Sequence, residues 1–185
     1  MPRQVDGESR DRDIRDATLR VIASHGVSGV TIRRVASELG ASTSVVTHFT
    51  RDKDELLRRA VGTELKERRR QVADIAATAD DPFWAVMEWS VDADPDGVWP
   101  ALVSAAAANV VPAVSQLVRS FDRWWTSLVA RLVSDRLIEG LSKRDAADAI
   151  GIVAEGLLLP LDAANWSAAR RHHLARTLIT PLLRR

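Results

Sequence analysis

The 185-residue sequence contains no cysteine. This absence excludes disulfide bridges, cysteine-ligated zinc sites and thiol nucleophiles, and it agrees with a reducing cytoplasm. No apolar run approaches the roughly 20 residues that a membrane-spanning helix needs. The N-terminal stretch MPRQVDGESRDRD also lacks the apolar core of a signal peptide. We therefore expect a soluble, cytoplasmic protein with no membrane partner.

A strong excess of one charge is also missing. The chain has 26 Lys and Arg against 25 Asp and Glu, which gives a net charge of +1. No global field draws such a protein onto DNA, so any contact with nucleic acid must come from a local patch. The length is sufficient for one or two small domains, each with a core.

Glycine and proline are scarce, with nine and seven residues, and they fall mainly between segments of helical periodicity. No segment alternates with the period of a strand, so we predict an all-α fold. Residues before about Arg10 are expected to form a loose arm. The predicted helices cover residues 10–26, 32–39, 43–49, 53–77, 82–93, 96–111, 112–140, 143–166 and 167–185.

The segment TIRRVASELGASTSVVTHF, residues 31–49, has the pattern of two helices joined by a tight turn. Thr31 is suited to cap the first helix, and Gly40 to form the turn. With Val46 and Phe49 buried, helical spacing turns a small polar face outward, and Ser, Thr and His side chains there can bond to base edges in a major groove. The outward residues are Ser42, Thr43, Ser44, Thr47 and His48. The alternative is a capped surface turn between two core helices.

Residues 14–57, IRDATLRVIASHGVSGVTIRRVASELGASTSVVTHFTRDKDELL, resemble the N-terminal DNA-binding region of the TetR family of transcriptional repressors. Thr47 occupies a position where a tyrosine is common in that family, and Thr50 one usually held by phenylalanine. The stretch VVTHF is similar to a variant found among actinobacterial members. The resemblance implies a three-helix DNA-binding domain, followed by a larger helical domain for ligand binding and dimerisation.

The resemblance also implies roles for particular residues. Thr31 and Arg33 match phosphate-contacting positions, Arg34 is a weaker candidate, and Lys53 would hold a phosphate beside a helix N-terminus. His48 has a second interpretation as an ordinary polar surface residue. The predicted DNA-contacting residues are Thr31, Arg33, Arg34, Ser42, Thr43, Ser44, Thr47, His48 and Lys53.

All six tryptophans lie after Asp80. An aromatic cluster around a cavity would suit a flat or apolar effector, or a cationic one through cation–π attraction. A tryptophan stripe at helical spacing can equally be plain core. The candidate effector-binding residues are Trp84, Glu88, Trp89, Trp99, Asn109, Phe121, Trp124 and Trp125.

The C-terminal segments AADAIGIVAEGLLLPLDAANW and LARTLITPLLRR resemble the helix pair that forms a four-helix dimer interface in the family. Their leucine content exceeds what one buried face requires, which favours a partner helix, although a leucine-rich helix can also be internal core. Pro160 is expected to kink its helix. The candidate interface residues are Ile150, Val153, Ala154, Leu157, Leu158, Leu161, Leu174, Leu178 and Leu182.

Motifs of catalysis are missing: there is no phosphate-binding glycine loop, no Gly-x-Ser-x-Gly and no His-Glu-x-x-His. His172 and His173 are adjacent and point apart in a helix, so they do not form one metal site. We expect no enzyme activity, no cofactor and no metal.

The prediction is a homodimeric repressor of a double-stranded DNA operator, with a DNA-binding domain in residues 1–52 and a ligand-binding and dimerisation domain in residues 53–185. Two alternatives remain open. One is a repressor without a small-molecule effector. The other is a ligand- or partner-binding helical protein whose helix-turn-helix no longer binds DNA.

Overall fold

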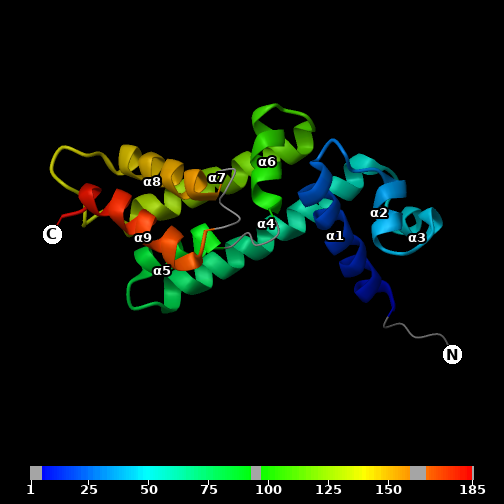
Figure 1. The fold of residues 1–185 in the computed structure, drawn as a ribbon, viewed down its shortest axis with the longest axis horizontal. Coiled ribbons are helices and arrows are strands. Elements are labelled where there is room, and N and C mark those ends of the chain that lie inside the picture. The colour runs from blue at the N-terminus through cyan, green and yellow to red at the C-terminus, as the bar shows by residue number, and fades with distance from the viewer. Residues whose placement is uncertain (1–5, 93–96, 159–165, 185) are drawn as a thin grey trace. The chain divides into compact units, whose positions relative to one another are not determined.

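A computed structural model describes residues 6–92, 97–158 and 166–184 (Figure 1). Apart from one isolated bridge between Leu137 and Leu183, the regular structure in these ranges is helical, as predicted. None of the helices there is long and apolar enough to cross a membrane alone, and α6 with α7 meets those criteria only as a pair bent by 111°. The helices are α1 (Asp6–His25), α2 (Ile32–Glu38), α3 (Thr43–Phe49), α4 (Lys53–Thr78), α5 (Pro82–Asp92), α6 (Val98–Ala107), α7 (Pro112–Leu132), α8 (Lys143–Leu158) and α9 (Ala168–Ile179), followed by a 3-10 turn (Thr180–Leu182).

Several predicted helix ends were wrong, including the C-terminus of α9, which lies at Ile179 and not at residue 185. Helix α1 begins at Asp6 and includes residues expected in the N-terminal arm, since no proline in residues 6–9 stops it. Helix α6 ends at Ala107, because Asn109 adopts a left-handed φ of 50°. Helix α7 ends at Leu132, where the chain turns and buries Leu137 against the C-terminal segment. The predicted kink at Pro160 lies outside the described residues.

The chain divides into two compact units. The first comprises Met1–Glu67 and Asp96–Arg119, and the second Arg68–Pro95 and Ser120–Arg185. Helices α4 and α7 therefore contribute residues to both units. The functional division predicted at residue 52 remains a prediction.

In the first unit, α1 packs against α2 and α6, and α2 packs against α3 (Figure 1). Apolar side chains recur on α1 with the spacing of one helical face, and this face is fully buried. The residues of this face are Ile14, Ala17, Val21 and Ile22, and each is 3% exposed or less. This packing fixes the frame on which the helix-turn-helix is built.

In the second unit, α5 packs against α8 and α9, and these two helices lie beside each other (Figure 1). Phe83 and Met87 of α5, Ile150 of α8 and Ile179 of α9 are fully buried there. A β-carbon added at Gly151 would lie 3.4 Å from Trp125 Cζ3, so glycine lets α8 approach the indole ring closely.

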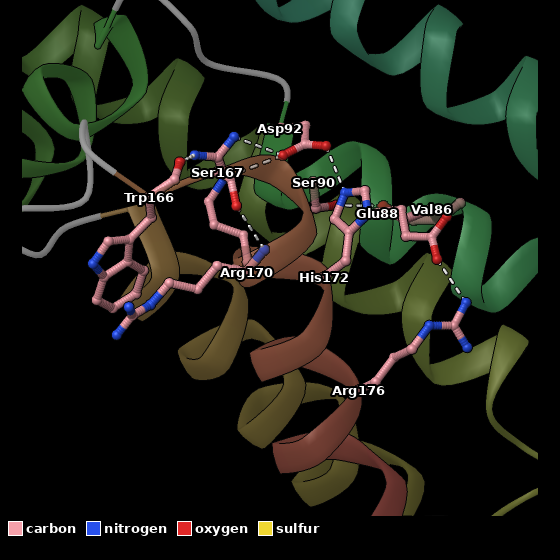
Figure 2. A network of polar contacts seen from close by, with 10 residues as sticks. Val86, Glu88, Ser90, Asp92, Trp166, Ser167, Arg170, His172 and Arg176 are labelled. Atoms are coloured by element: carbon pink, nitrogen blue, oxygen red, sulfur yellow. Dashed lines mark hydrogen bonds and ion pairs between the residues drawn. The ribbon is translucent and has the colours of Figure 1, made fainter.

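Ion pairs and hydrogen bonds between charged side chains join α5 to α9 (Figure 2). The Asp92 carboxylate accepts from Arg171 Nη2 at 2.8 Å and pairs with His172 Nε2 at 2.5 Å. One turn away, Glu88 Oε1 accepts from Arg176 Nη2 at 2.6 Å. These charged hydrogen bonds fix how α9 lies along α5.

Asp122 on α7 and Glu155 on α8 have raised pKa values, and no cationic side chain is paired with either among the described residues. Burial raises the pKa of Glu155, and the nearby Asp122 carboxylate raises it further. Burial also raises the pKa of Asp122, with a second contribution from Asp148. Both groups bind a proton more tightly in the folded protein than in the unfolded chain.

This difference predicts how stability depends on pH. Because the folded-state pKa of Glu155 is raised, stability falls as pH rises from the group's ordinary value of 4.5 through the raised pKa. Glu155→Gln should therefore stabilise the protein at pH 7, by less than about 1 kcal/mol because the group is half exposed. Thermal melting from pH 4 to pH 8 measures this. The gain should vanish near pH 4 and be absent for the exposed Glu139→Gln control; an equal gain at all pH values would contradict it.

Candidate nucleic-acid interface

The turn between α2 and α3 is closed by a Schellman motif. Ala41 N donates to Ala36 O at 2.9 Å, and Gly40 N donates to Ser37 O at 3.1 Å. Gly40 has a φ of 67°, a left-handed conformation that side chains with a β-carbon rarely adopt. The predicted cap is confirmed, since Thr31 Oγ1 accepts from Arg34 N at 3.1 Å. Thr31 therefore determines where α2 begins, and Gly40 determines the turn that sets the direction of α3.

The polar face of α3 is exposed as predicted. Val46 is completely buried and Phe49 half-buried, while the opposite side chains of α3 and its N-cap are exposed. Ser42 stands at the N-cap position of α3, but its side chain makes no cap hydrogen bond, because its Oγ pairs with Ser44 Oγ at 2.7 Å. The exposed residues are Ser42, Thr43, Ser44, Thr47 and His48. Hydroxyl and imidazole groups are thus presented to solvent on one side of a short helix.

The three predicted phosphate-binding cations differ in their surroundings. Lys53 Nζ donates to Ser28 O at 3.2 Å, and Arg34 Nη1 donates to Gly29 O, so both bind the loop between α1 and α2. Arg33 is exposed and has no partner within the described part of the chain. Arg33 can therefore bind a phosphate without breaking another contact. Lys53 and Arg34 would have to give up their hydrogen bonds to backbone carbonyls, or donate to a carbonyl and a phosphate at once.

The start of α4 lies beside this face and is capped by acidic side chains. Asp52 Oδ1 accepts from Glu55 N at 2.8 Å, and Glu55 Oε2 accepts from Arg51 N at 2.8 Å. The backbone hydrogen bond from Arg51 lowers the pKa of Glu55. Thr50, at a position where phenylalanine is usual, is buried and donates to Asp52 O at 2.9 Å. Its hydroxyl thus helps to form the connection between α3 and α4.

The candidate effector residues fall in both compact units. Trp99 and Asn109 belong to the first, where Trp99 is buried and Asn109 is exposed in the turn after α6. Asn109 Oδ1 accepts from Arg119 Nη2 at 3.3 Å, so the side chain of Asn109 has a partner within its own unit. The second unit holds Trp84, Glu88, Trp89, Phe121, Trp124 and Trp125.

Arginines already cover several of these aromatic rings. Arg176 Cζ lies 4.5 Å from the centroid of Trp84 and its guanidinium also binds Glu88, so the ring and the carboxylate predicted to attract a cation are both occupied. Arg69 Cζ lies 5.5 Å from the centroid of Trp124. Trp84 and Trp89 are half-buried. Trp125 is buried and donates to Ser90 Oγ at 3.2 Å.

The candidate dimer residues on α8, on α9 and in the 3-10 turn after it divide into two groups. Three of them are buried within the protomer, because α8 turns this face towards its own unit: Ile150, Ala154 and Leu157. In the monomer these side chains are therefore not exposed for contact with a partner. Val153, Leu158, Leu174 and Leu182 are half-buried, and Leu178 is 52% exposed. Leu161 lies outside the described residues. Sequence analysis missed Ile152, which is 73% exposed on α8.

Sequence analysis also missed Arg59 of α4, whose guanidinium joins α4 to two other helices. Arg59 Nη1 donates to Phe49 O at the C-terminus of α3, and Nη2 binds Asp11 Oδ1 of α1 at 2.5 Å. Basic groups are favourable at a helix C-terminus, where carbonyls lack helical partners. Arg59 thus fixes the end of α3, although no local sequence signal distinguishes it from Arg58.

Arg59→Met should loosen α3 without unfolding the protein. Because both partners are partly exposed, we expect about 1 kcal/mol or less of lost stability, with faster amide exchange concentrated in the last turn of α3. Hydrogen exchange measured by NMR tests this, with the exposed neighbour Arg58→Met as the matched control. Equal exchange in α3 of both variants would show that Arg59 does not position the helix.

Comparison with known proteins places this geometry in a family. A sequence model of the tetR family of bacterial regulatory proteins matches residues 14–60, the region of α1 to α4 described above. The transcriptional regulator BetI of Stenotrophomonas maltophilia is 31% identical over 170 residues, which are 86% of this chain and 84% of that protein. The regulator PksA of Bacillus subtilis is 37% identical over 76 residues, and the match spans only 41% of this chain and 37% of PksA.

A solved structure extends the likeness to the whole fold. A transcriptional regulator from Saccharomonospora viridis, determined in complex with choline, superposes with a TM-score of 0.74 over 96% of this chain and 99% of that one, at 21% identity. The helix-turn-helix, the family model and the relative that matches along most of its length agree. The chain belongs to the tetR family of bacterial regulatory proteins and is a DNA-binding transcriptional regulator.

Proposed function

We propose that the protein is a homodimeric repressor that binds a pseudo-palindromic operator in the cytoplasm and is released by a small-molecule effector. The exposed polar face of α3, opposite the buried Val46, carries this proposal. A helix of this kind enters a major groove, and two-fold symmetry in the protein demands two half-sites.

The proposed contacts divide into two kinds. Thr43, Ser44, Thr47 and His48, with Ser42, contact bases through single hydrogen bonds and methyl groups, so sequence preference also depends on DNA shape. The phosphates are contacted by residues on either side of α3 in the sequence: Thr31, Arg33, Arg34 and Lys53. Arg33 makes the first contact, and Lys53 follows when it leaves Ser28 O.

Dimerisation is proposed through the outward face of α8 together with α9. Ile152 lies at the centre of that face, between half-buried Ala149 and exposed Gly156. A β-carbon at Gly156 would meet nothing within 4 Å, so a second helix can approach closely there. Leu178 of α9 adds exposed apolar surface. Val153, Leu158, Leu174 and Leu182 are half-buried and would be covered further by the partner.

The effector is proposed to bind in the second unit and to act on α4. Because operator and effector favour different states, each lowers the affinity for the other by the same factor. Choline in the Saccharomonospora viridis structure would suggest a cation. Arg176 already occupies Trp84 and Glu88, which argues against a cation at that position.

Operator binding is tested by fluorescence anisotropy with a labelled duplex from upstream of the protein's own gene. Specific binding should exceed that of a shuffled duplex by at least about 10³-fold. Lys53→Ala should flatten the salt dependence by about one unit of slope, because one phosphate contact is lost. Thr43→Ala should instead erode the preference for the native sequence, by about 1 kcal/mol or more.

Arg144→Ala on α8 is the control for loss of a positive charge, since it lies in the second unit. Weak and equal binding to both duplexes would be followed by selection from random DNA. An empty selection would exclude sequence-specific binding and favour a partner-binding protein with a degenerate helix-turn-helix.

The dimer is tested by Ile152→Glu. The change places two like charges opposite each other at the proposed two-fold contact and should convert the dimer to a monomer at micromolar concentration. Sedimentation velocity measures the change. Ile138→Glu is the matched control, because Ile138 is also exposed but lies in the turn after α7. A dimer that persists in Ile152→Glu would place the interface elsewhere.

A further inference from the structure

Arg69 of α4 lies over two neighbouring aromatic rings of α7, within the second unit. Its Cζ lies 5.9 Å from the ring centroid of Phe121 and 5.5 Å from that of Trp124. The two rings are 5.6 Å apart, with an angle of 48° between their planes. Ring contacts of this kind engage the guanidinium through its π face and leave the in-plane N–H groups available for hydrogen bonds.

One edge of this guanidinium is only half satisfied. Nη2 donates to Ser120 Oγ at 3.1 Å. Nε, on the same edge, is buried and has no hydrogen-bond acceptor among the described residues. A buried donor without an acceptor has lost its hydrogen bonds to water and has formed none within the protein. This costs free energy, so such groups are rare, and a ligand that accepts the hydrogen bond would bind favourably there.

Arg69 has no carboxylate partner among the described residues, unlike three other arginines of its unit that lie beside aromatic or acidic side chains. Arg136 binds Asp81, Arg171 binds Asp92, and Arg176 binds Glu88. Among the described residues no Asp or Glu pairs with Arg69 in this way. Its positive charge, held away from water at Nε, is therefore uncompensated.

Apolar surface adjoins the same point. Trp124 packs against the cluster formed by Val72, Val86 and Leu128, together with the half-buried Trp89 and Ile75. Trp124 thus belongs both to the Arg69 stack and to this apolar cluster. A molecule with a carboxylate at one end could bind Arg69 and lay its apolar body on these side chains.

We propose that Arg69 is the anchor of the effector site, and that the effector is an organic anion with a carboxylate and a flat apolar body. The carboxylate would bind the Nε–Nη2 edge side-on, with Ser120 yielding or sharing Nη2. This inference rests on the proposed effector-responsive function and names its ligand class. The tryptophans led us to expect a flat, apolar or cationic effector. The proposal keeps the flat apolar body and rejects the cationic alternative, because protein cations already occupy the rings of Trp84 and Trp124.

The test uses three probes with one ring system and different charge: 2-naphthoate, neutral 2-naphthamide and the cationic 2-naphthylmethylammonium. Isothermal titration calorimetry on the full-length protein should give at least about tenfold tighter binding for the carboxylate, the gain typical of charge-assisted hydrogen bonds. Arg69→Met should remove this preference. Arg70→Met is the matched control, because Arg70 is exposed and binds Asp74.

A second readout reports on the Nε–H itself. Its NMR resonance, identified by its disappearance in Arg69→Lys, should move downfield when naphthoate binds and remain in place with naphthamide. Circular dichroism should show unchanged helix content in Arg69→Met, so that lost binding is not lost folding. Equal or tighter binding of the cation or the amide, naphthoate binding retained in Arg69→Met, or no naphthoate binding at 10 mM, roughly the weakest affinity of interest, would each overturn the proposal.

The outcome is separable from the regulatory function. Selective naphthoate binding that leaves operator affinity unchanged would keep the anion site and reject its role as the effector site. Specific operator binding with no anion selectivity would keep the regulator and reject the site. Selective binding that also weakens operator affinity, with both effects lost in Arg69→Met and kept in Arg70→Met, supports the whole proposal.

Discussion

The burial of Val46 in the first unit is the constraint on which the proposed DNA-binding face depends. Val46 has no exposed surface, and α3 is so short that one buried side chain determines which residues point outward. The Schellman turn at Gly40 sets where α3 begins, and Arg59 holds the carbonyl at its end. A short helix of marginal intrinsic stability is thereby fixed at both ends and at its centre. The small hydroxyl side chains contribute little to helix stability, so they remain available for the proposed contact with DNA.

In the second unit, arginines determine what the aromatic residues can do. A tryptophan-rich sequence suggests rings open to a cationic or apolar ligand, yet Arg69 and Arg176 lie over rings of α7 and α5. The two arginines differ in one respect. Arg176 shares its charge with Glu88, whereas the buried Nε of Arg69 lacks an acceptor among the described residues. The arginine over Trp84 therefore has a carboxylate partner, whereas the arginine over Trp124 keeps a buried hydrogen-bond donor without an acceptor. Only the arginine over Trp124 can thus form a new hydrogen bond to a ligand through that donor.

Local rules predicted the helix-turn-helix well and the second unit poorly. Thr31, Gly40 and Asp52 act through bonds to residues no more than three positions away, or through their own backbone conformation, so the sequence contains the whole signal. The outward face of α3 follows from helical spacing alone. The partners of Trp84 and Asp92, by contrast, lie on α9, about eighty or more positions along the chain. Nothing in the triplet at residues 68–70 distinguishes the stacked Arg69 from the exposed Arg70, since only the tertiary fold places one of them on aromatic rings. Ile150, Ala154 and Leu157 were assigned to a partner for the same reason: a leucine-rich helix does not state which of its faces its own protomer covers.

Helix α4 carries the residues through which the two proposed activities would communicate. Lys53 at its first position is proposed to bind phosphate, Arg59 holds α3, and Arg69 is proposed to bind the effector. An effector that completes the hydrogen bonds of Arg69 favours whichever arrangement of α4 presents that edge best. An operator favours the arrangement in which Lys53 and α3 meet the backbone and groove together. If these arrangements differ, the coupling free energy is their difference, and it must be equal for the two ligands. A compound that binds Arg69 equally well in both arrangements would bind tightly and regulate nothing. Affinity for the anion site and power to release DNA are therefore separate properties, and selection for a regulator acts on the second.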